Sequence, residues 1–347
     1  MRQTFVGVPM KILIIQTAFI GDVVLATPLI EKLKEKFKDC TIDFLLRKGN
    51  ESLLYNHPHI HKVFILDKKK NKYRNVFRLI NDIRAESYDY AINLQRFLTT
   101  GLITSLSGAK VKIGFDKNPL SFLFTHALKH QLSKSNSVIH EVDRNLSLIQ
   151  SIVGDNEFEM PKLYPSVNDY EIIPGKDEYI CIAPSSVWFT KQFPASKWCE
   201  LIDKIPDHYT IYLIGAQGDI DLCEEIQKNT ESNKVEILAG KLTLLQSVAL
   251  IEKAEMTFVN DSAPLHFASA RNAPVTAIFC STVPAFGFGP LSVNSHIVEV
   301  DEKLDCKPCG LHGKKKCPRQ HFKCSHIDVE RILTQANLGA GSTHHLK

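Results

Sequence analysis

Short apolar runs alternate with longer amphipathic segments along most of the chain. The runs are bounded by polar or glycine-containing turns, as buried strands are, and the segments between them carry apolar residues at helical spacing. Strands are predicted at 11–16, 41–46, 62–66, 90–94 and 110–114, and again at 179–183, 210–214, 235–238, 256–259 and 275–279. Because strand and helix alternate in both halves, the pattern predicts an α/β protein with two doubly wound, Rossmann-like domains that face each other across a cleft.

The same pattern predicts the helices of the first half. One helix is expected from Asp22 to about Phe37, with Pro28 inside it as a kink or a delayed start. A single long helix is expected over 140–153. The strand at 110–114 is predicted to be the last of the first series, with a loop or short helix at 119–126 after it.

A change in composition marks the boundary between the two halves. Residues 156–176 hold three prolines and a glycine with little periodicity, which is typical of a linker. The sequence therefore predicts an N-terminal domain at 1–165 and a C-terminal domain at 166–338. The tail at 339–347 is small and polar, and we expect it to be disordered.

Composition and charge narrow the class of protein. The chain has 347 residues, 44% of them hydrophobic, and a formal net charge of +4, which is ordinary for two globular domains and does not suggest a nucleic-acid partner. No run approaches the roughly 18 apolar residues of a membrane span, and MRQTFVGVPM lacks the apolar core of a signal peptide. Five of the nine cysteines are scattered through predicted helices and strands. These features favour a reduced, cytoplasmic protein.

The stretch 257–282 carries the clearest candidate chemistry. A buried strand leads into the turn Asn260–Ser262, Pro264 falls in the first turn of a short helix, and a second buried strand follows. This turn lies where parallel sheets bind ligands, and a helix N-terminus there suits a pyrophosphate. Asp261 and His266 are then the polar side chains nearest such a ligand. In the alternative interpretation, Asp261 only caps the helix and His266 is packed within it.

At this point four segments carry a family resemblance. KILIIQTAFIGDVVLATPLIEKLKEKF resembles the N-terminal signature of glycosyltransferase family nine, the ADP-heptose:lipopolysaccharide heptosyltransferases. VNDSAPLHFASARNAPVTAIFCSTVP resembles the C-terminal signature, and LIGAQGDIDLCEEI and LAGKLTLLQSVALIEKAE match in kind and order. The resemblance implies the GT-B fold and an inverting, metal-independent transfer without a cofactor. It also implies ADP-heptose as donor, a lipid A–core acceptor, and peripheral contact with the cytoplasmic face of the inner membrane.

The resemblance also implies roles for particular residues. Asp22 matches the family's general base, and Lys191 its phosphate-binding lysine; Asp219 matches an acid that faces the nucleotide ribose. We expect Asp261 to accept hydrogen bonds from the sugar while Lys191 holds the diphosphate. The remaining donor-binding candidates are Ser185, Ser186, Thr190, Ser262 and His266. The acceptor-binding candidates are Arg96, His140 and Arg144. Where the family usually has glycine after its Asp-Ser/Thr pair, this chain has Ala263.

Several alternatives stay open at this stage. Asp22 and Asp219 also read as acids at helix N-termini, and Lys191 as a loop lysine. A nucleotide-sugar epimerase or a non-catalytic sugar-nucleotide-binding module shares the architecture. The segment CKPCGLHGKKKCPRQHFKC is either a structural zinc site or a group of packed thiols, and its run Lys314–Lys316 is either a membrane-facing patch or part of a solvated loop.

Overall fold

The computed structural model describes residues 9–67, 72–134, 137–155, 157–173 and 178–338. The chain forms two compact units, and the boundary between them lies between Tyr164 and Pro165. The last residues, 339–347, for which we expect disorder, lie outside the described residues. Each unit is described here by itself.

The first unit is built on a parallel sheet. In the described part of the unit, this sheet has six strands in the order β3-β2-β1-β4-β5-β6. The strands are β1 (Lys11–Ile15), β2 (Thr41–Arg47), β3 (Ile60–Leu66), β4 (Tyr90–Asn93), β5 (Val111–Phe115) and β6 (His126–Leu128), and β7 (Ser133–Lys134) pairs with β8 (Ser137–Val138) as a small separate hairpin. The order outward from β1 in both directions is that of a doubly wound sheet, as predicted.

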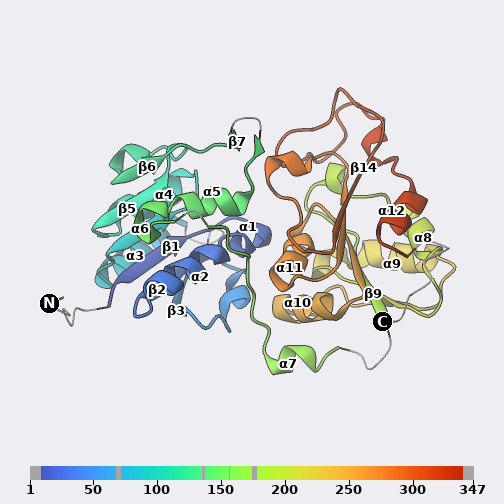
Figure 1. Cartoon of the computed structure of the whole chain (residues 1–347), viewed down its shortest axis with the longest axis horizontal. Helices are drawn as coiled ribbons and strands as arrows, with labels where there is room; N and C mark the ends of the chain where they lie inside the picture. The colour runs from blue at the N-terminus through green and yellow to red at the C-terminus, as the bar shows by residue number, and fades with distance from the viewer. Residues whose placement is uncertain (1–8, 68–71, 135–136, 156, 174–177, 339–347) are drawn as a thin grey trace. The chain divides into compact units, whose positions relative to one another are not determined.

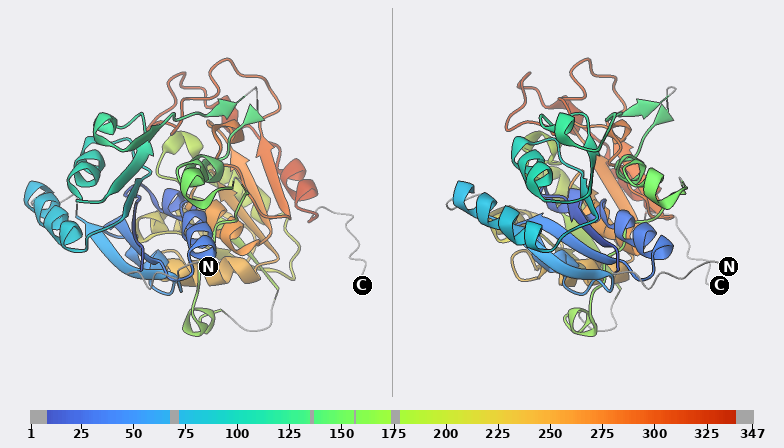
Figure 2. Two further views of the ribbon diagram at one scale, coloured as in Figure 1. Left: turned by 60° about the vertical axis from the view of Figure 1, so that its left-hand side comes forward. Right: turned by 90° about the vertical axis from the view of Figure 1, so that its left-hand side faces the viewer.

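Helices cover both faces of this sheet (Figures 1 and 2). The helical segments are α1 (Ile20–Val24), α2 (Thr27–Lys36), η1 (Glu51–Leu54), α3 (Lys72–Ala85), α4 (Leu98–Leu106), η2 (Ser121–Leu123), α5 (Glu141–Ser147) and α6 (Gln150–Val153). Leu13 and Ile15 of β1 pack with Ile80 and Ile83 of α3 and Ile103 of α4 in one buried cluster. β1 therefore lies at the centre of the core, and the loop that follows it is held rigidly.

The helix expected at 22–37 is divided just before Pro28, the residue at which a kink or a delayed start was predicted, because Pro28 has no N–H to continue the first helix and the Thr27 hydroxyl donates to the Val24 carbonyl at 2.8 Å instead. Two other predictions for this unit are wrong in detail. The helix expected at 140–153 is also two, since its middle tightens into i→i−3 bonds such as Leu148 N to Asn145 O (3.1 Å). The strand at 111–115 is not the last, because β6 pairs with it.

The second unit repeats the design. Among the described residues its sheet has the order β11-β10-β9-β12-β13-β14, again all parallel. The strands are β9 (Tyr179–Ala183), β10 (Thr210–Leu213), β11 (Val235–Ile237), β12 (Met256–Asn260), β13 (Val275–Phe279) and β14 (Ser295–Glu299). The helical segments are α7 (Val167–Tyr170), η3 (Phe189–Lys191), α8 (Ala195–Ile202), η4 (Gln217–Asp219), α9 (Ile220–Asn229), α10 (Leu244–Lys253), α11 (Ala263–Arg271), η5 (Pro284–Phe286), η6 (Lys323–Ser325) and α12 (Val329–Gln335).

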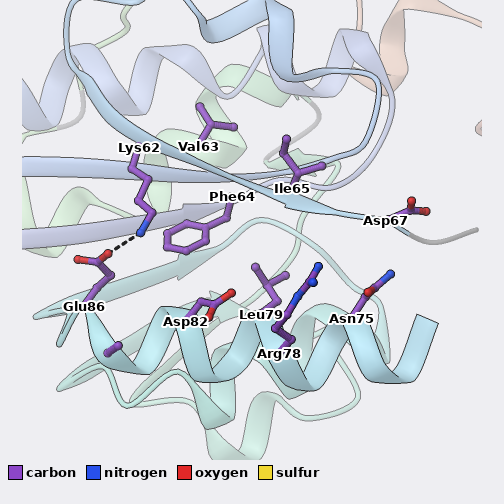
Figure 3. Close-up of a pocket in the computed structure, with 11 residues that line it drawn as sticks. Lys62, Val63, Phe64, Ile65, Asp67, Asn75, Arg78, Leu79, Asp82 and Glu86 are labelled. Atoms are coloured by element: carbon purple, nitrogen blue, oxygen red, sulfur yellow. Dashed lines mark hydrogen bonds and ion pairs between the residues drawn. The ribbon is translucent and has the colours of Figure 1, made fainter. Parts of the chain in front are cut away.

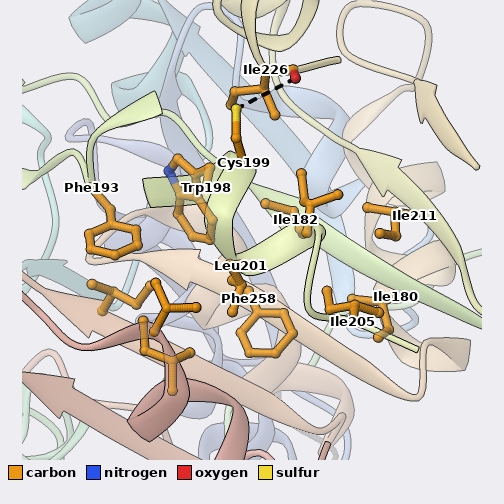
Figure 4. Packing of buried hydrophobic residues seen from close by; sticks show 14 of the residues in the cluster. Ile180, Ile182, Phe193, Trp198, Cys199, Leu201, Ile205, Ile211, Ile226 and Phe258 are labelled. Carbon is orange, nitrogen blue, oxygen red and sulfur yellow. Dashed lines mark hydrogen bonds between the residues drawn. The ribbon is translucent and has the colours of Figure 1, made fainter. Parts of the chain in front are cut away.

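The core of this unit fills the space between the sheet and α8, α9 and α12 (Figure 4). Trp198 of α8 is fully buried, and its ring meets Phe193 edge to face at 5.3 Å between centroids. Ile182 of β9 and Phe258 of β12 lie in the same cluster. Because β9 and β12 are central strands, buried on both faces, the loops that follow them start from a rigid base.

Candidate active site

Asp22 lies in the loop-to-helix turn that follows β1. It is the third residue of α1, and its Oδ2 accepts a hydrogen bond from the Phe19 backbone N–H at 3.1 Å. β1 and β4 run parallel with Ile15 beside Asn93, so the loops after both strands begin at the same edge of the sheet. Asp22 is half-buried. It therefore caps its helix, as the alternative interpretation proposed, and remains accessible at the ligand-binding edge.

The acceptor-binding candidates occupy different environments. Arg96 is exposed in the loop after β4. His140 caps α5, with its Nδ1 accepting from the Val142 N–H at 3.2 Å. Arg144 is buried, and its Nε donates to Glu141 at 2.8 Å. Arg144 is thus placed to hold Glu141 rather than to present a free guanidinium, whereas Arg96 is exposed, and its acceptor-binding role stays a prediction.

Glu141 is a charged neighbour of Asp22 to which sequence reasoning assigned no role. The Glu141–Arg144 pair sits on the first turn of α5, which is tied to the end of α1 because Asn145 Nδ2 donates to the Leu25 carbonyl at 3.0 Å. Burial raises the pKa of the Glu141 carboxyl to about 7; Arg144 opposes this shift and the negative charge of Asp22 adds to it. Near neutral pH, the charge beside Asp22, the candidate base, therefore changes as Glu141 gains or loses its proton.

We expect Glu141 to make the stability of the protein depend on pH. The pKa of Glu141 in the folded protein, about 7, is above its ordinary value of 4.5, so the folded state holds a proton that the unfolded chain releases. Stability from this group is complete below the ordinary value and is lost as the pH rises through about 7. Thermal unfolding of wild type and Glu141→Gln across this range measures the effect, and the loss should be smaller in the variant. Equal pH dependence in both proteins would show that Glu141 is not the titrating group.

In the second unit, Lys191, which is partly buried, and Asp261, which is buried, form an ion pair beyond the ends of neighbouring strands. Lys191 ends η3, in the loop after β9, and Asp261 follows β12 directly. Lys191 Nζ lies 2.6 Å from Asp261 Oδ2, which also accepts from the Thr282 hydroxyl at 2.6 Å. We expected Asp261 to accept hydrogen bonds from the sugar while Lys191 holds the diphosphate. In the structure Asp261 also holds the lysine, so the two side chains do not act separately.

Asn260, which the sequence analysis left without a role, clamps the two loops together. Its Nδ2 donates to the Pro184 carbonyl at 2.7 Å, and its Oδ1 accepts from the Phe193 N–H at 2.9 Å. The side chain is fully buried. Ser185 and Ser186 lie half-buried within this clamped loop. The sequence signal that could have identified Asn260 is its place at the end of an apolar strand, because a buried amide side chain must find hydrogen-bond partners.

Asp219 lies at the mouth of the neighbouring loop. Its Oδ2 accepts from the Ala216 N–H at 2.7 Å, which closes the turn that leads into α9. A Cβ on Gly215 would lie 2.8 Å from the same oxygen, so the close approach of this carboxylate requires glycine. Asp219 is half-buried. Its role toward a ribose stays a prediction. What the structure shows is that its side chain closes the turn before α9.

Ser262 and His266 lie on α11, the helix that follows Asp261. Ser262 is the N-cap residue, and its hydroxyl donates to the Asn260 carbonyl at 3.4 Å rather than capping the helix. Ala263 and Pro264 open the helix and are only partly buried. His266 is buried, with its ring 6.5 Å from that of Phe288. The N-terminal end of α11 is thus open beside the Lys191–Asp261 pair.

The four cysteines of the segment 306–324 line one pocket of about 370 Å³ together with His321 and Thr190. Burial raises the pKa of Cys324 to about 11, and the neighbouring Cys309 thiol adds to this. Within the described residues, no three histidine, cysteine or acidic side chains are arranged as ready metal ligands. The two interpretations of the segment, a structural zinc site and a group of packed thiols, both stay untested.

A larger hollow of about 440 Å³ lies in the first unit between β3 and α3 (Figure 3). Lys62 and Glu86 form an ion pair at one end of it, with 2.6 Å between Nζ and Oε1. None of the predicted site residues lines it. The candidate chemistry is therefore at the carboxyl edges of the two sheets and not in this hollow.

Two doubly wound parallel sheets, with an acid after the first strand of one and a lysine–aspartate pair in the other, are the arrangement expected of a GT-B protein. The chain belongs to glycosyltransferase family 9 (heptosyltransferase), whose family model matches residues 76–320. It is 29% identical over 279 residues to lipopolysaccharide heptosyltransferase 3 of Escherichia coli, a match that covers 76% of this chain and 82% of the relative.

Two solved structures share the fold. The glycosyltransferase family 9 protein of Veillonella parvula superimposes with a TM-score of 0.80 at 19% identity, covering 94% of this chain and 96% of that one. E. coli ADP-heptose lipopolysaccharide heptosyltransferase II superimposes with a TM-score of 0.73 at 21% identity, covering 94% and 99%. The GT-B prediction is confirmed, and the family does not favour the epimerase alternative.

Proposed function

We propose that this glycosyltransferase moves a heptose from ADP-heptose to a lipopolysaccharide core acceptor, with inversion at the anomeric carbon and without a metal. The observation that carries the proposal is the Lys191–Asp261 ion pair beside the N-terminal end of α11, in a chain whose family is described as heptosyltransferases. A lysine and a helix N-terminus together suit the charge of a leaving diphosphate.

Each residue has a defined part in the proposed reaction. Asp22 accepts the proton of the acceptor hydroxyl as its oxygen attacks the anomeric carbon of the heptose. The bond from that carbon to the diphosphate oxygen breaks, and ADP leaves with its charge balanced by Lys191. Asp219 meets the ribose, while Asp261 orients Lys191 and accepts bonds from the sugar. Arg96 and His140 are proposed to contact the acceptor.

Release of ADP from ADP-heptose, measured with and without a core acceptor, tests this function. A transferase releases ADP in proportion to added acceptor, because the reaction needs the attacking hydroxyl. We therefore expect slow release without acceptor and a large increase with it. Equal release under both conditions would contradict transfer, and binding of ADP-heptose without any release would show a non-catalytic module.

We also propose contact with the cytoplasmic membrane face, through a surface on the first unit. Four large apolar side chains there are at least half exposed: Phe97, Leu98, Phe122 and Leu123, at 52%, 60%, 77% and 50%. Asn118 joins the two loops that carry them, since its Nδ2 donates to the Gln95 and Phe97 carbonyls at 2.8 and 3.2 Å. Arg96 and Lys117 are exposed in the same loops. Apolar side chains beside cations suit an anionic membrane interface. Within the described ranges, no helix has the length and apolar character needed to span a bilayer.

Replacing Phe122 and Leu123 together with serine should lower the fraction of protein that sediments with vesicles containing anionic lipid. The two side chains supply much of the exposed apolar area of this surface. Phe77→Ser is the matched control, because Phe77 is 56% exposed but lies on α3. If both proteins sediment like wild type, the membrane contact lies elsewhere.

A further inference from the structure

Thr190 joins the Lys191 loop to the cysteine-containing segment. Its backbone N–H donates to the Lys314 carbonyl at 3.1 Å, and its hydroxyl oxygen accepts from the Lys314 N–H at 2.8 Å. The same oxygen accepts from the Ser281 hydroxyl at 2.9 Å. Thr190 is 1% exposed. The hydroxyl oxygen therefore already accepts two hydrogen bonds from the protein. Together with its burial, this geometry does not suit the predicted direct contact of Thr190 with the donor.

Gly313 packs against the aliphatic part of the Lys191 side chain. Its φ of +75° is in the left-handed region, and a Cβ at this position would lie 3.1 Å from Lys191 Cγ and 3.2 Å from Thr190 Oγ1 and Trp188 Cβ. Such contacts are tighter than ordinary van der Waals contact. The glycine thus lets the segment reach the aliphatic part of the lysine side chain while the ammonium group meets Asp261.

We infer that Thr190 and Gly313 are positioning residues for Lys191, and that the loop 310–316, which we call the support loop, sets the place of the lysine at the donor diphosphate. This inference rests on the proposed donor role of Lys191. Lys191 is held from two sides, by Asp261 at its ammonium group and by the support loop along its stem. A lysine has a long, flexible side chain, so fixing it in advance removes an ordering cost that donor binding would otherwise carry.

The inference predicts a coupled effect on nucleotide binding. Thr190→Val keeps the shape of the side chain but leaves the Lys314 N–H and the Ser281 hydroxyl without their acceptor. We expect it to weaken ADP binding about three- to tenfold, and Thr190→Ser, which keeps the hydroxyl, to restore most of it. Thr276→Val is the matched control, because Thr276 is equally buried but lies on β13.

A double-mutant cycle with Lys191→Ala, read by calorimetric titration of ADP into the full-length protein, provides the decisive test. If Thr190 acts through Lys191, Thr190→Val should have little further effect once the lysine is gone. If Thr190→Val causes the same loss of ADP affinity in the Lys191→Ala background as in the wild-type protein, the positioning role of Thr190 is wrong, while the donor role of Lys191 stands. If Lys191→Ala by itself leaves ADP binding unchanged, the donor role of Lys191 is wrong and the inference falls with it.

Gly313→Ala keeps the inference testable if Thr190→Val does not fold. The added Cβ forces the lysine stem or the support loop to move, so ADP binding should weaken in wild type and much less in the Lys191→Ala background. Gly310→Ala is the matched control, since Gly310 also has a positive φ but no atom within 4 Å of the added Cβ. Equal effects of the two substitutions on ADP binding would overturn the inference.

Discussion

Asp22→Asn is expected to remove sugar transfer almost completely while ADP-heptose binding and folding stay near those of wild type. The asparagine side chain can still accept the hydrogen bond from the Phe19 N–H, so the cap of α1 is preserved. What is lost is a group that can take the proton of the attacking hydroxyl, and such losses typically cost about 10²–10⁴ in rate. Steady-state transfer assays together with donor titrations measure both quantities.

The control for Asp22 is Asp143→Asn, on the first turn of α5. Asp143 is exposed and follows Glu141 by two residues on this turn. This variant should transfer sugar at nearly the rate of wild type. Wild-type turnover in Asp22→Asn would assign the base to another residue, and the proposed mechanism would then be wrong.

Lys191→Ala is expected to weaken ADP and ADP-heptose by similar factors. A charge-assisted hydrogen bond contributes about 1.5–3 kcal/mol, which corresponds to roughly tenfold or more in affinity. The substitution also leaves Asp261 buried without its cation, so it is expected to destabilise the fold as well. The double variant Lys191→Met/Asp261→Asn removes both charges, and it should regain thermal stability without regaining ADP affinity.

Lys197→Ala serves as the charge control for Lys191. Lys197 lies on α8 in a half-exposed pair with Glu200, so its removal changes the net charge of the second unit without touching the candidate site. It should bind ADP like wild type. A similar loss of ADP affinity in both lysine variants would show that the effect of Lys191 is one of overall charge.

The inner strands at the candidate donor site could be predicted from the sequence because they are buried on both faces, and α11 because its residues 265–270 are buried. β9 and β13 begin and end where the apolar runs do. Two of the edge strands, β6 and β14, could not be predicted in this way, because half of their side chains are polar, whereas the edge strands β3 and β11 fall on predicted apolar runs. The break between α1 and α2 was indicated by Pro28, but the break between α5 and α6 depends on local hydrogen bonds that periodicity does not encode.

The site residues could be found singly but not as pairs. Lys191 and Asp261 are far apart in the sequence, and only the parallel pairing of β9 with β12 brings their loops to one edge. The effect of Asp22 on the pKa of Glu141 likewise depends on how α5 packs against the end of α1. Thr190 shows the opposite case, since its hydroxyl was expected to face the donor and instead accepts bonds from Lys314 and Ser281.

The mass of a core acceptor, incubated with the protein and ADP-heptose, tests the central claim most directly. The account predicts that the acceptor gains one heptosyl unit, that one ADP appears for each unit transferred, and that Asp22→Asn forms almost no product. An acceptor of unchanged mass, while ADP-heptose is consumed, would contradict heptose transfer as the function of this chain.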